Sequence, residues 1–190
     1  MHFIKKNIII PLVVFIIGMS AVAGIVCSIN NEQNKQNRTM ANLNAMTYAE
    51  RMKTDIMKGI GVSDTLRQII ISDDGQLNKF YEIAEEMMTD SVQSIQIAPD
   101  CVVTDIYPQE DNDAGKIDLL NDKDRGEICR YGRDNKVVTM QGPFQLKQGG
   151  YGIAVRNPVY IEENGHEDFW GFTIAVSYTH LRAHETVLDL

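Results

Sequence analysis

The sequence predicts an α+β protein with a single N-terminal membrane-spanning helix, a long juxtamembrane helix, and a domain of about five antiparallel strands. Three observations predict this fold class. Residues 8–29 are nearly all apolar or small, spaced apolar residues follow as far as residue 58, and three runs within residues 142–176 alternate with period two. Period-two alternation interrupted by glycine and asparagine is typical of consecutive antiparallel strands.

The N-terminal stretch has the length and composition of a membrane span. Residues 7–31 carry no charge, and about 20 apolar residues in a helix cross a bilayer. Lys5 and Lys6 precede the stretch, whereas Glu32 is the first charge after it; basic residues favour the cytoplasmic side. A cleaved signal peptide is the alternative, but the apolar run is longer than such peptides usually have. The predicted segments are cytoplasmic residues 1–6, a transmembrane helix over 7–29 and an extracytoplasmic domain over 30–176.

Residues 30–59 predict the long helix. Their apolar residues recur in steps of three and four and form one stripe, as in an amphipathic helix: Met40, Leu43, Met46, Ala49, Met52, Ile56 and Met57. The stripe packs either on its own domain or on the same helix of a second copy in a homodimer. Gly59 and Gly61 predict the end of the helix, because glycine weakens a helix interior.

Two short helices and a hairpin are expected next. Ser63 or Asp64 can cap the first helix, Asp73–Gly75 ends it, and a second follows with Phe80, Ala84 and Met87 inward. Strands over Val92–Ile97 and Val102–Tyr107 flank the turn signal Pro99-Asp100. A helix over Lys123–Asn135 and a lead-in over Val137–Met140 then precede the three-strand meander. We expect the helices to cover one face of the sheet, within a sheet region over 92–176.

The composition argues against several functions. The net charge of -8 over 190 residues excludes the basic face that nucleic acid requires. In the acidic loop 109–115, Ala114 falls where an EF-hand needs an oxygen ligand. His180, His184 and Glu185 lack the order of a zinc helix, so we expect neither metal nor cofactor. Three cysteines give an odd count; Cys101 and Cys129 are the two that could pair outside the cell.

No catalytic residues are predicted. The glycines at 149, 150 and 152 are not followed by the Lys-Ser/Thr of a phosphate-binding loop, and no G-x-S-x-G sequence occurs. We therefore do not expect this chain to be an enzyme.

Residues on or beside the predicted strands suggest a pocket for a small ligand. Such pockets combine aromatic walls with a few polar groups. Arg156 can hold a ligand carboxylate through its two-pronged donor geometry; a structural ion pair with a nearby acid is the alternative. The candidate ligand-binding residues are Tyr107, Phe144, Tyr151, Arg156, Tyr160 and Trp170.

Several motifs together resemble a known family. The runs SIQIAPDCVVTDIYP, DLLNDKDRG, GPFQLKQGGYGIAVRNPVY and FWGFTIAV are similar to the bacterial CHASE domain, an extracytoplasmic sensor of histidine kinases and diguanylate cyclases. The resemblance covers about Met40–Val176 and implies a PAS-like fold that senses a small molecule or peptide. Cys101 stands where glycine is expected in a P-D-G turn, which argues against a family role for this thiol.

The resemblance also implies a cytoplasmic output domain. We interpret residues 177–190 as a non-native tail that resembles translated sequencing adapter, because they break the strand pattern, and we expect the gene to be truncated there. The predicted function is that of a membrane receptor's sensory domain, in which ligand shifts the Met40–Lys58 helix. A membrane-tethered protein-interaction module without a pocket is one alternative, and the regulatory end of a truncated histidine kinase or diguanylate cyclase is the other.

Overall fold

The structure is a computed structural model that describes residues 3–109, 115, 117–146, 149–163 and 165–179. The chain forms two compact units, residues 1–49 and residues 50–190. Helix α1 (Phe3–Ser72) contributes to both.

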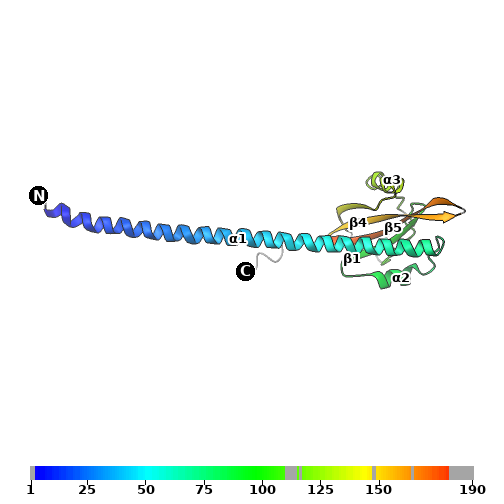
Figure 1. Ribbon diagram of the computed structural model, residues 1–190, viewed down its shortest axis with the longest axis horizontal. Helices are drawn as coiled ribbons and strands as arrows, with labels where there is room; N and C mark the ends of the chain where they lie inside the picture. Colours follow the sequence, from blue (N-terminus) through cyan, green and yellow to red (C-terminus); the bar gives the residue numbers. More distant parts are fainter. Residues whose placement is uncertain (1–2, 110–114, 116, 147–148, 164, 180–190) are drawn as a thin grey trace. The chain divides into compact units, whose positions relative to one another are not determined.

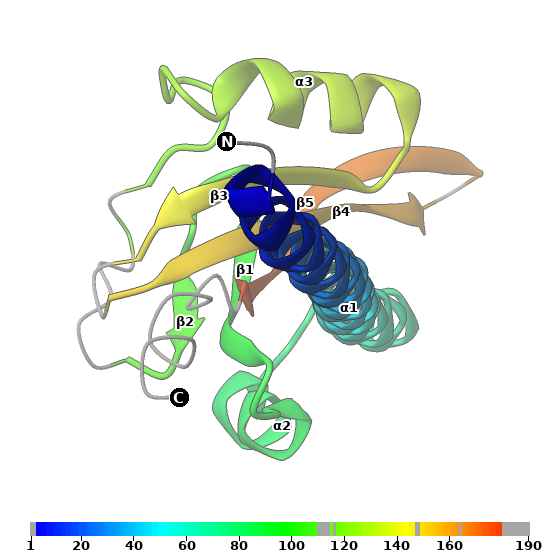
Figure 2. The same ribbon diagram turned by 90° about the vertical axis from the view of Figure 1, so that its left-hand side faces the viewer.

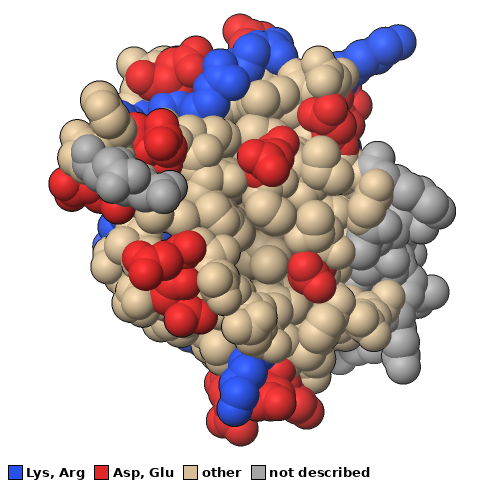
Figure 3. All heavy atoms as spheres, turned by 90° about the vertical axis from the view of Figure 1, so that its right-hand side faces the viewer, with Lys and Arg blue, Asp and Glu red and all other residues tan. Residues whose placement is uncertain are grey.

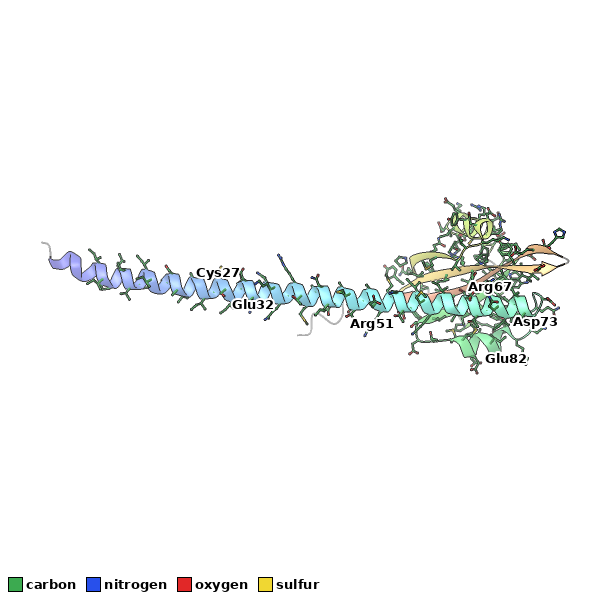
Figure 4. The ribbon with its side chains drawn as sticks, in the orientation of Figure 1. Cys27, Glu32, Arg51, Arg67, Asp73 and Glu82 are labelled. Carbon is green, nitrogen blue, oxygen red and sulfur yellow. The ribbon has the colours of Figure 1, made fainter. Side chains whose placement is uncertain are left out.

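The first unit consists of the N-terminal part of α1. Its apolar side chains are exposed from Ile9 onward, including Phe15, Ile16 and Ile17. Beginning at Ile9, the helix is long and apolar enough to cross a membrane, as the composition predicted. Cys27 and Glu32 mark the change from apolar to polar sequence along this helix (Figure 4).

Helix α1 does not end at Gly59 and Gly61, so the prediction of a break there was wrong. The helix is continuous to Ser72, and Ser63 is a buried residue inside it rather than a cap, its hydroxyl donating to the Ile60 carbonyl at 2.9 Å. Gly59 lies against the sheet, where a Cβ would be 2.6 Å from Ser177 Oγ. Tertiary packing at this close approach outweighs the low helix propensity of glycine.

The segment after α1 agrees with the predicted helix and hairpin. Helix α2 (Phe80–Met87) follows a turn at Asp73–Gly75. Strand β1 (Val92–Pro99) pairs antiparallel with β2 (Asp105–Tyr107), which is shorter than predicted. At the turn between them, Cys101 has φ 68°, the left-handed conformation that favours glycine.

The rest of the chain forms α3 (Gly126–Asn135) and the predicted meander. The meander consists of β3 (Thr139–Gln145), β4 (Tyr151–Glu163) and β5 (His166–Thr179). All neighbouring strands are antiparallel, in the order β2-β1-β5-β4-β3. The sheet thus has β5 at its centre and β3 at one edge (Figure 2).

Helices cover both faces of the sheet, so the expectation of one covered face was wrong. On one face, Leu66 and Ile70 of α1 and Phe80 of α2 pack on Ile95 and Val159. On the other face lies α3, which Figures 1 and 2 show on the side of the sheet opposite α2. Cys129 of α3 belongs to a second core. The strand residues in this core are Ala98, Ile106, Ala154, Phe172, Ile174 and Val176.

Strand β5 extends past Val176, where the predicted tail began. Ser177 pairs with Val92 of β1, and Thr179 pairs with Tyr151 of β4. Ser177 is buried, and its hydroxyl donates to the Asp55 carbonyl of α1 at 3.2 Å. The strand pattern therefore does not break at residue 177. His180, His184 and Glu185 lie outside the described residues.

Candidate functional site

The candidate site lies on the sheet face that α3 covers. Thr139 of β3 is opposite Arg156 of β4, and Gln141 is opposite Ala154. Side chains two residues apart on a strand share a face, and a Cβ at Gly132 of α3 would lie 3.0 Å from Thr139 Cγ2. These four side chains therefore lie on the face beneath α3.

Arg156 is the central feature of this face. The residue is 3% exposed, and its Nε and Nη1 have no hydrogen-bond partner among the described residues. Burial lowers its pKa from the usual range, but an arginine stays protonated in proteins. A guanidinium charge is therefore held in the interior.

The predicted alternative, a structural ion pair of Arg156, is not found in the described part of the chain. Asp122 acts on Arg156 electrostatically, but its Oδ2 accepts from Arg125 Nη1 at 2.5 Å. Its Oδ1 also accepts the backbone N–H groups of Asp124 and Arg125, both at 2.9 Å. This acid is thus engaged in the turn that leads into α3.

Two neutral polar atoms near Arg156 are also buried without a partner in the part of the chain that the structure describes. They are Thr139 Oγ1 and Gln141 Oε1. Gln141 Nε2 donates to the Asp124 carbonyl at 2.6 Å, so only the amide nitrogen can face that carbonyl. The amide is thereby oriented with its oxygen as the free acceptor. Buried polar atoms without partners are uncommon in native proteins and call for an explanation.

The cysteines near the site are free and buried, so the alternative of a Cys101–Cys129 bridge is not found. Burial raises the pKa of the Cys101 thiol to about 11. Burial also raises the pKa of Cys129, while the neighbouring charge of Arg156 acts in the opposite direction. Both thiols are neutral at physiological pH and act as apolar lining.

Three of the six candidate ligand residues lie on this face: Arg156, Phe144 and Tyr160. Phe144 packs against the core beneath α3. Tyr160 donates its hydroxyl to the Arg133 carbonyl of α3, and its ring meets Phe169 edge-on at 5.3 Å. Tyr160 therefore ties the end of α3 to the sheet.

The other three candidates lie elsewhere. Tyr107 and Trp170 pack on the opposite core, with α1 and α2. The Trp170 indole donates to the Gly75 carbonyl at 3.1 Å, which fixes the turn after α1. Tyr151 is 47% exposed. The structure therefore does not bring these three together with Arg156.

Sequence reasoning missed Thr139 and Gln141. Residues 137–140 were interpreted only as a lead-in to the meander, although Thr139 and Gln141 alternate with Met140 in the pattern of a strand. The pattern that could have identified them is a pair of polar residues two positions apart, which places both on one face of a strand. Only the register with β4 shows that these two side chains lie on the face of the sheet that α3 covers.

An open groove of about 790 Å³ lies between α1 and the outer ends of β4 and β5. Four of its charged residues form ion pairs: Arg67 Nε lies 3.2 Å from Asp64 Oδ1, and Lys136 pairs with Glu167. The fifth, Glu162, is exposed to solvent. Arg67 belongs to α1, Asp73 to the turn that follows it, and Glu82 to α2 (Figure 4). On the face of the molecule drawn in Figure 3, the acidic side chains over the middle are isolated among uncharged residues, whereas those at the top and bottom adjoin basic side chains. The groove therefore offers no unpaired charge comparable to Arg156.

Comparison with known proteins supports the fold. No protein-family model matches the chain, and no curated protein matches it. Among solved structures, the chain is similar to an extracellular ligand-binding receptor from Desulfohalobium retbaense DSM5692, with a TM-score of 0.55 and 10% identity over 70% of this chain and 24% of that one. The ligand-binding domain of the Pseudomonas aeruginosa PAO1 amino acid chemoreceptor PctC in complex with GABA gives a TM-score of 0.44 and 12% identity, over 67% of this chain and 58% of that one. This chain thus spans about a quarter of the first protein and just over half of the second. The fold is one that an extracellular ligand-binding receptor uses.

Proposed function

We propose that this chain is the membrane-anchored, extracytoplasmic sensory domain of a receptor and that it binds a small ligand beneath α3. The observation that carries the proposal is Arg156, a buried charge without a partner among the described residues. An uncompensated buried charge costs several kcal/mol. A ligand anion at this position would offset that cost.

The resemblance to the CHASE domain and its PAS-like fold supports the sensory assignment. The motif GPFQLKQGGYGIAVRNPVY runs from β3 into β4, and FWGFTIAV lies in β5. The motif residues thus supply the strands that carry the candidate site. In this proposal the N-terminus is cytoplasmic, and the intact receptor includes an output domain of the histidine kinase or diguanylate cyclase class.

Helix α3 is the element best suited to open for a ligand. Only three of its residues are buried, Gly126, Cys129 and Gly132. The Tyr160 hydroxyl and the ion pair of Lys136 with Glu167 tie its C-terminal end to the sheet, and the Gln141 amide binds the turn just before it. An element with few buried apolar contacts opens at low free-energy cost. We propose that ligand enters beneath α3 and that α3 then closes over it.

The route for the signal runs from β4 through β5 to α1. Arg156 pairs with Ile174 of β5, next to Thr173. On the opposite face, Thr173 Oγ1 donates to the Ser63 carbonyl of α1 at 2.8 Å, and Ser177 Oγ donates to that of Asp55. A displacement of β4 by ligand would therefore act on α1. The ligand can bias α1 only by its differential affinity for the two positions.

A ligand screen tests the sensing proposal. The full chain is purified in detergent, and its thermal unfolding is followed through Trp170, the single tryptophan, against a broad library of metabolites, peptides and ions. A ligand present at 100 times its Kd stabilises the folded state by about 2.7 kcal/mol. We expect a stabilising compound whose effect is lost in Arg156→Met and kept in Arg51→Met, a change on the exposed surface of α1 (Figure 4). Absence of any stabilising compound would contradict the proposal.

Exposed apolar residues on α1 favour a second role, contact with a protein partner, which is a second copy of the chain in the simplest case. They are Met40, Leu43, Met46, Met52 and Met57, each more than 40% exposed. Apolar residues spaced along one helix are typical of helix–helix interfaces. Met46→Cys should then give a disulfide-linked dimer in membranes, whereas Asn44→Cys, at an exposed position on the opposite side of the helix, should not. Equal cross-linking at both positions would argue against a specific dimer.

A further inference from the structure

We infer that the ligand of this site is a small monocarboxylic acid that also carries a hydrogen-bond donor. The inference rests on the proposed sensing function and specifies its ligand class. It comes from three side chains on one buried face, Arg156, Thr139 and Gln141, whose unpartnered atoms together define the complementary chemistry.

The charge of the ligand follows from the charge of the site. Arg156 Nε and Nη1 have no partner among the described residues, whereas Arg125 is paired with Asp122. A monoanion would neutralise the site. A dianion such as sulfate would leave one negative charge buried near Asp122, and a buried charge without a partner is costly. A carboxylate is the common biological monoanion that matches the planar guanidinium.

The donor on the ligand follows from Gln141. Because the Gln141 amide nitrogen is held by the Asp124 carbonyl, its Oε1 can only accept, and a carboxylic acid without a donor would leave it unpartnered. The neighbouring Thr139 hydroxyl can donate or accept, so it fits the carboxylate or the donor group. Together the three side chains suit a hydroxy or amino acid better than a simple fatty acid.

The spacing of the side chains along the strands matches the length of such a molecule. Gln141 lies two residues beyond Thr139, which is about 7 Å along a strand. Opposite Gln141 stands Ala154, whose small side chain is on the same face. In this arrangement the carboxylate of the ligand lies beside Arg156 and Thr139, and its hydrogen-bond donor lies beside Gln141 and over the small side chain of Ala154. Cys129 and the other apolar residues of the core beneath α3 lie on the same face.

The test uses butyrate, the three hydroxybutyrate positional isomers and sulfate, titrated calorimetrically into the detergent-purified full chain at constant ionic strength. We expect at least one hydroxybutyrate to bind about tenfold or more tightly than butyrate, because butyrate leaves Gln141 Oε1 unpartnered. Sulfate should bind most weakly. Gln141→Leu should reduce the preference for the hydroxy acid to about twofold or less, and Gln141→Met, which keeps the side-chain length, serves the same purpose if the first variant does not fold. Arg156→Met should abolish binding of all the acids, and Arg51→Met should change nothing.

The ligand class is overturned if sulfate binds as tightly as the acids, if butyrate equals every hydroxybutyrate, or if the Gln141 variants keep the discrimination. It is also overturned if none of these probes binds. In that case the library screen separates the two proposals. A stabilising compound without a carboxylate that still requires Arg156 would leave the sensing function standing, whereas no stabilising compound of any kind would reject both.

Discussion

At the scale of single residues, Arg156 stands out because its environment opposes its charge. The side chain is buried, its Nε and Nη1 lack partners among the described residues, and desolvation lowers its pKa. A folded-state pKa below the unfolded value means that the protonated form destabilises the fold. The buried charge therefore destabilises the fold, and in the function that we propose a bound anion would offset this cost. Perturbed ionisable groups of this kind are common at functional sites.

Replacement of Arg156 by methionine should stabilise the ligand-free protein. The change removes the buried charge and keeps most of the side-chain volume, and we expect the free energy of unfolding to rise by about 1–3 kcal/mol. Urea denaturation monitored through Trp170 measures the change. The exposed control Arg51→Met should stay within about 0.5 kcal/mol. A clear loss of stability in Arg156→Met would instead assign Arg156 a structural role.

Gly171 illustrates a different constraint on a single residue, in the middle of β5. It has φ 149°, and a Cβ there would lie 2.1 Å from the Ala98 carbonyl oxygen of β1. The neighbouring strand thus occupies the space of any side chain. Gly171 also adjoins the irregular register of β4 and β5, in which Tyr160 pairs with Phe169 but Val159 pairs with Gly171.

Gly171→Ala should destabilise the domain by about 4 kcal/mol or more, or prevent its accumulation, because backbone atoms cannot move away as a flexible side chain can. Gly165→Ala is the matched control. Gly165 also has a positive φ, of 79°, but open space surrounds it, so only the left-handed conformation is penalised, by about 1–2 kcal/mol. Similar losses in the two variants, measured by the same urea denaturation, would refute the close approach at Gly171.

At the scale of elements, the contact of α1 with β5 depends on matched spacings. Thr173 and Ser177 are four residues apart, about 13 Å along a strand. Their acceptors, the carbonyls of Ser63 and Asp55, are eight residues apart, about 12 Å along a helix. Gly59 lies midway between the acceptors, against Ser177, Val155 and Ala175. Two hydrogen bonds and one close approach thus fix the position of the helix on the sheet.

Gly59→Ala should lower stability by about 1–3 kcal/mol, since the new methyl group overlaps Ser177 Oγ. Combining it with Ser177→Ala should recover most of the loss, because the remaining neighbours lie at 3.5 Å and beyond. Gly61→Ala has open space and should raise stability by up to about 1 kcal/mol through helix propensity. Thermal unfolding of the unmodified chain, the three single variants (Gly59→Ala, Ser177→Ala and Gly61→Ala) and the double variant provides the comparison, and an additive double variant would contradict direct contact.

The sequence predicted the elements better than their arrangement. Alternation located β3, β4 and β5 because side chains on a half-buried strand repeat every two residues. It did not show that α1 continues through Gly59, because packing against another element is absent from local propensity. Nor did it place α3 opposite α1 and α2, because the face that a helix covers depends on how the chain crosses the sheet.

The same limit applies to the site. Arg156 was identified from its type and its position on a strand. Thr139 and Gln141 could be assigned to the site only from the register between β3 and β4. Tyr107 and Trp170 could be excluded from it only once the face on which each side chain lies was known. Hydrogen bonds such as the one from the Trp170 indole to the Gly75 carbonyl join residues far apart in the chain. No local pattern contains them.

At the scale of the whole molecule, the apolar start of α1 predicts membrane attachment. The exposed apolar side chains from Ile9 onward would be unfavourable in water. We expect the full chain to stay in the membrane fraction after alkaline carbonate extraction. The paired substitutions Val14→Glu and Ile17→Glu should release it, because charges at the centre of a span are costly. Release of the unmodified chain by carbonate would contradict a membrane-spanning segment.

The two hydrogen bonds between α1 and β5 also matter to anyone who builds receptor chimaeras from this domain. A fusion junction placed N-terminal to Asp55 leaves both bonds and the Gly59 contact intact. Seven residues advance an α-helix by two turns to within about 20°. Linkers inserted upstream in multiples of seven should therefore preserve the angular phase of the sensor relative to a grafted helix, whereas insertions of two or five residues should turn it to another side.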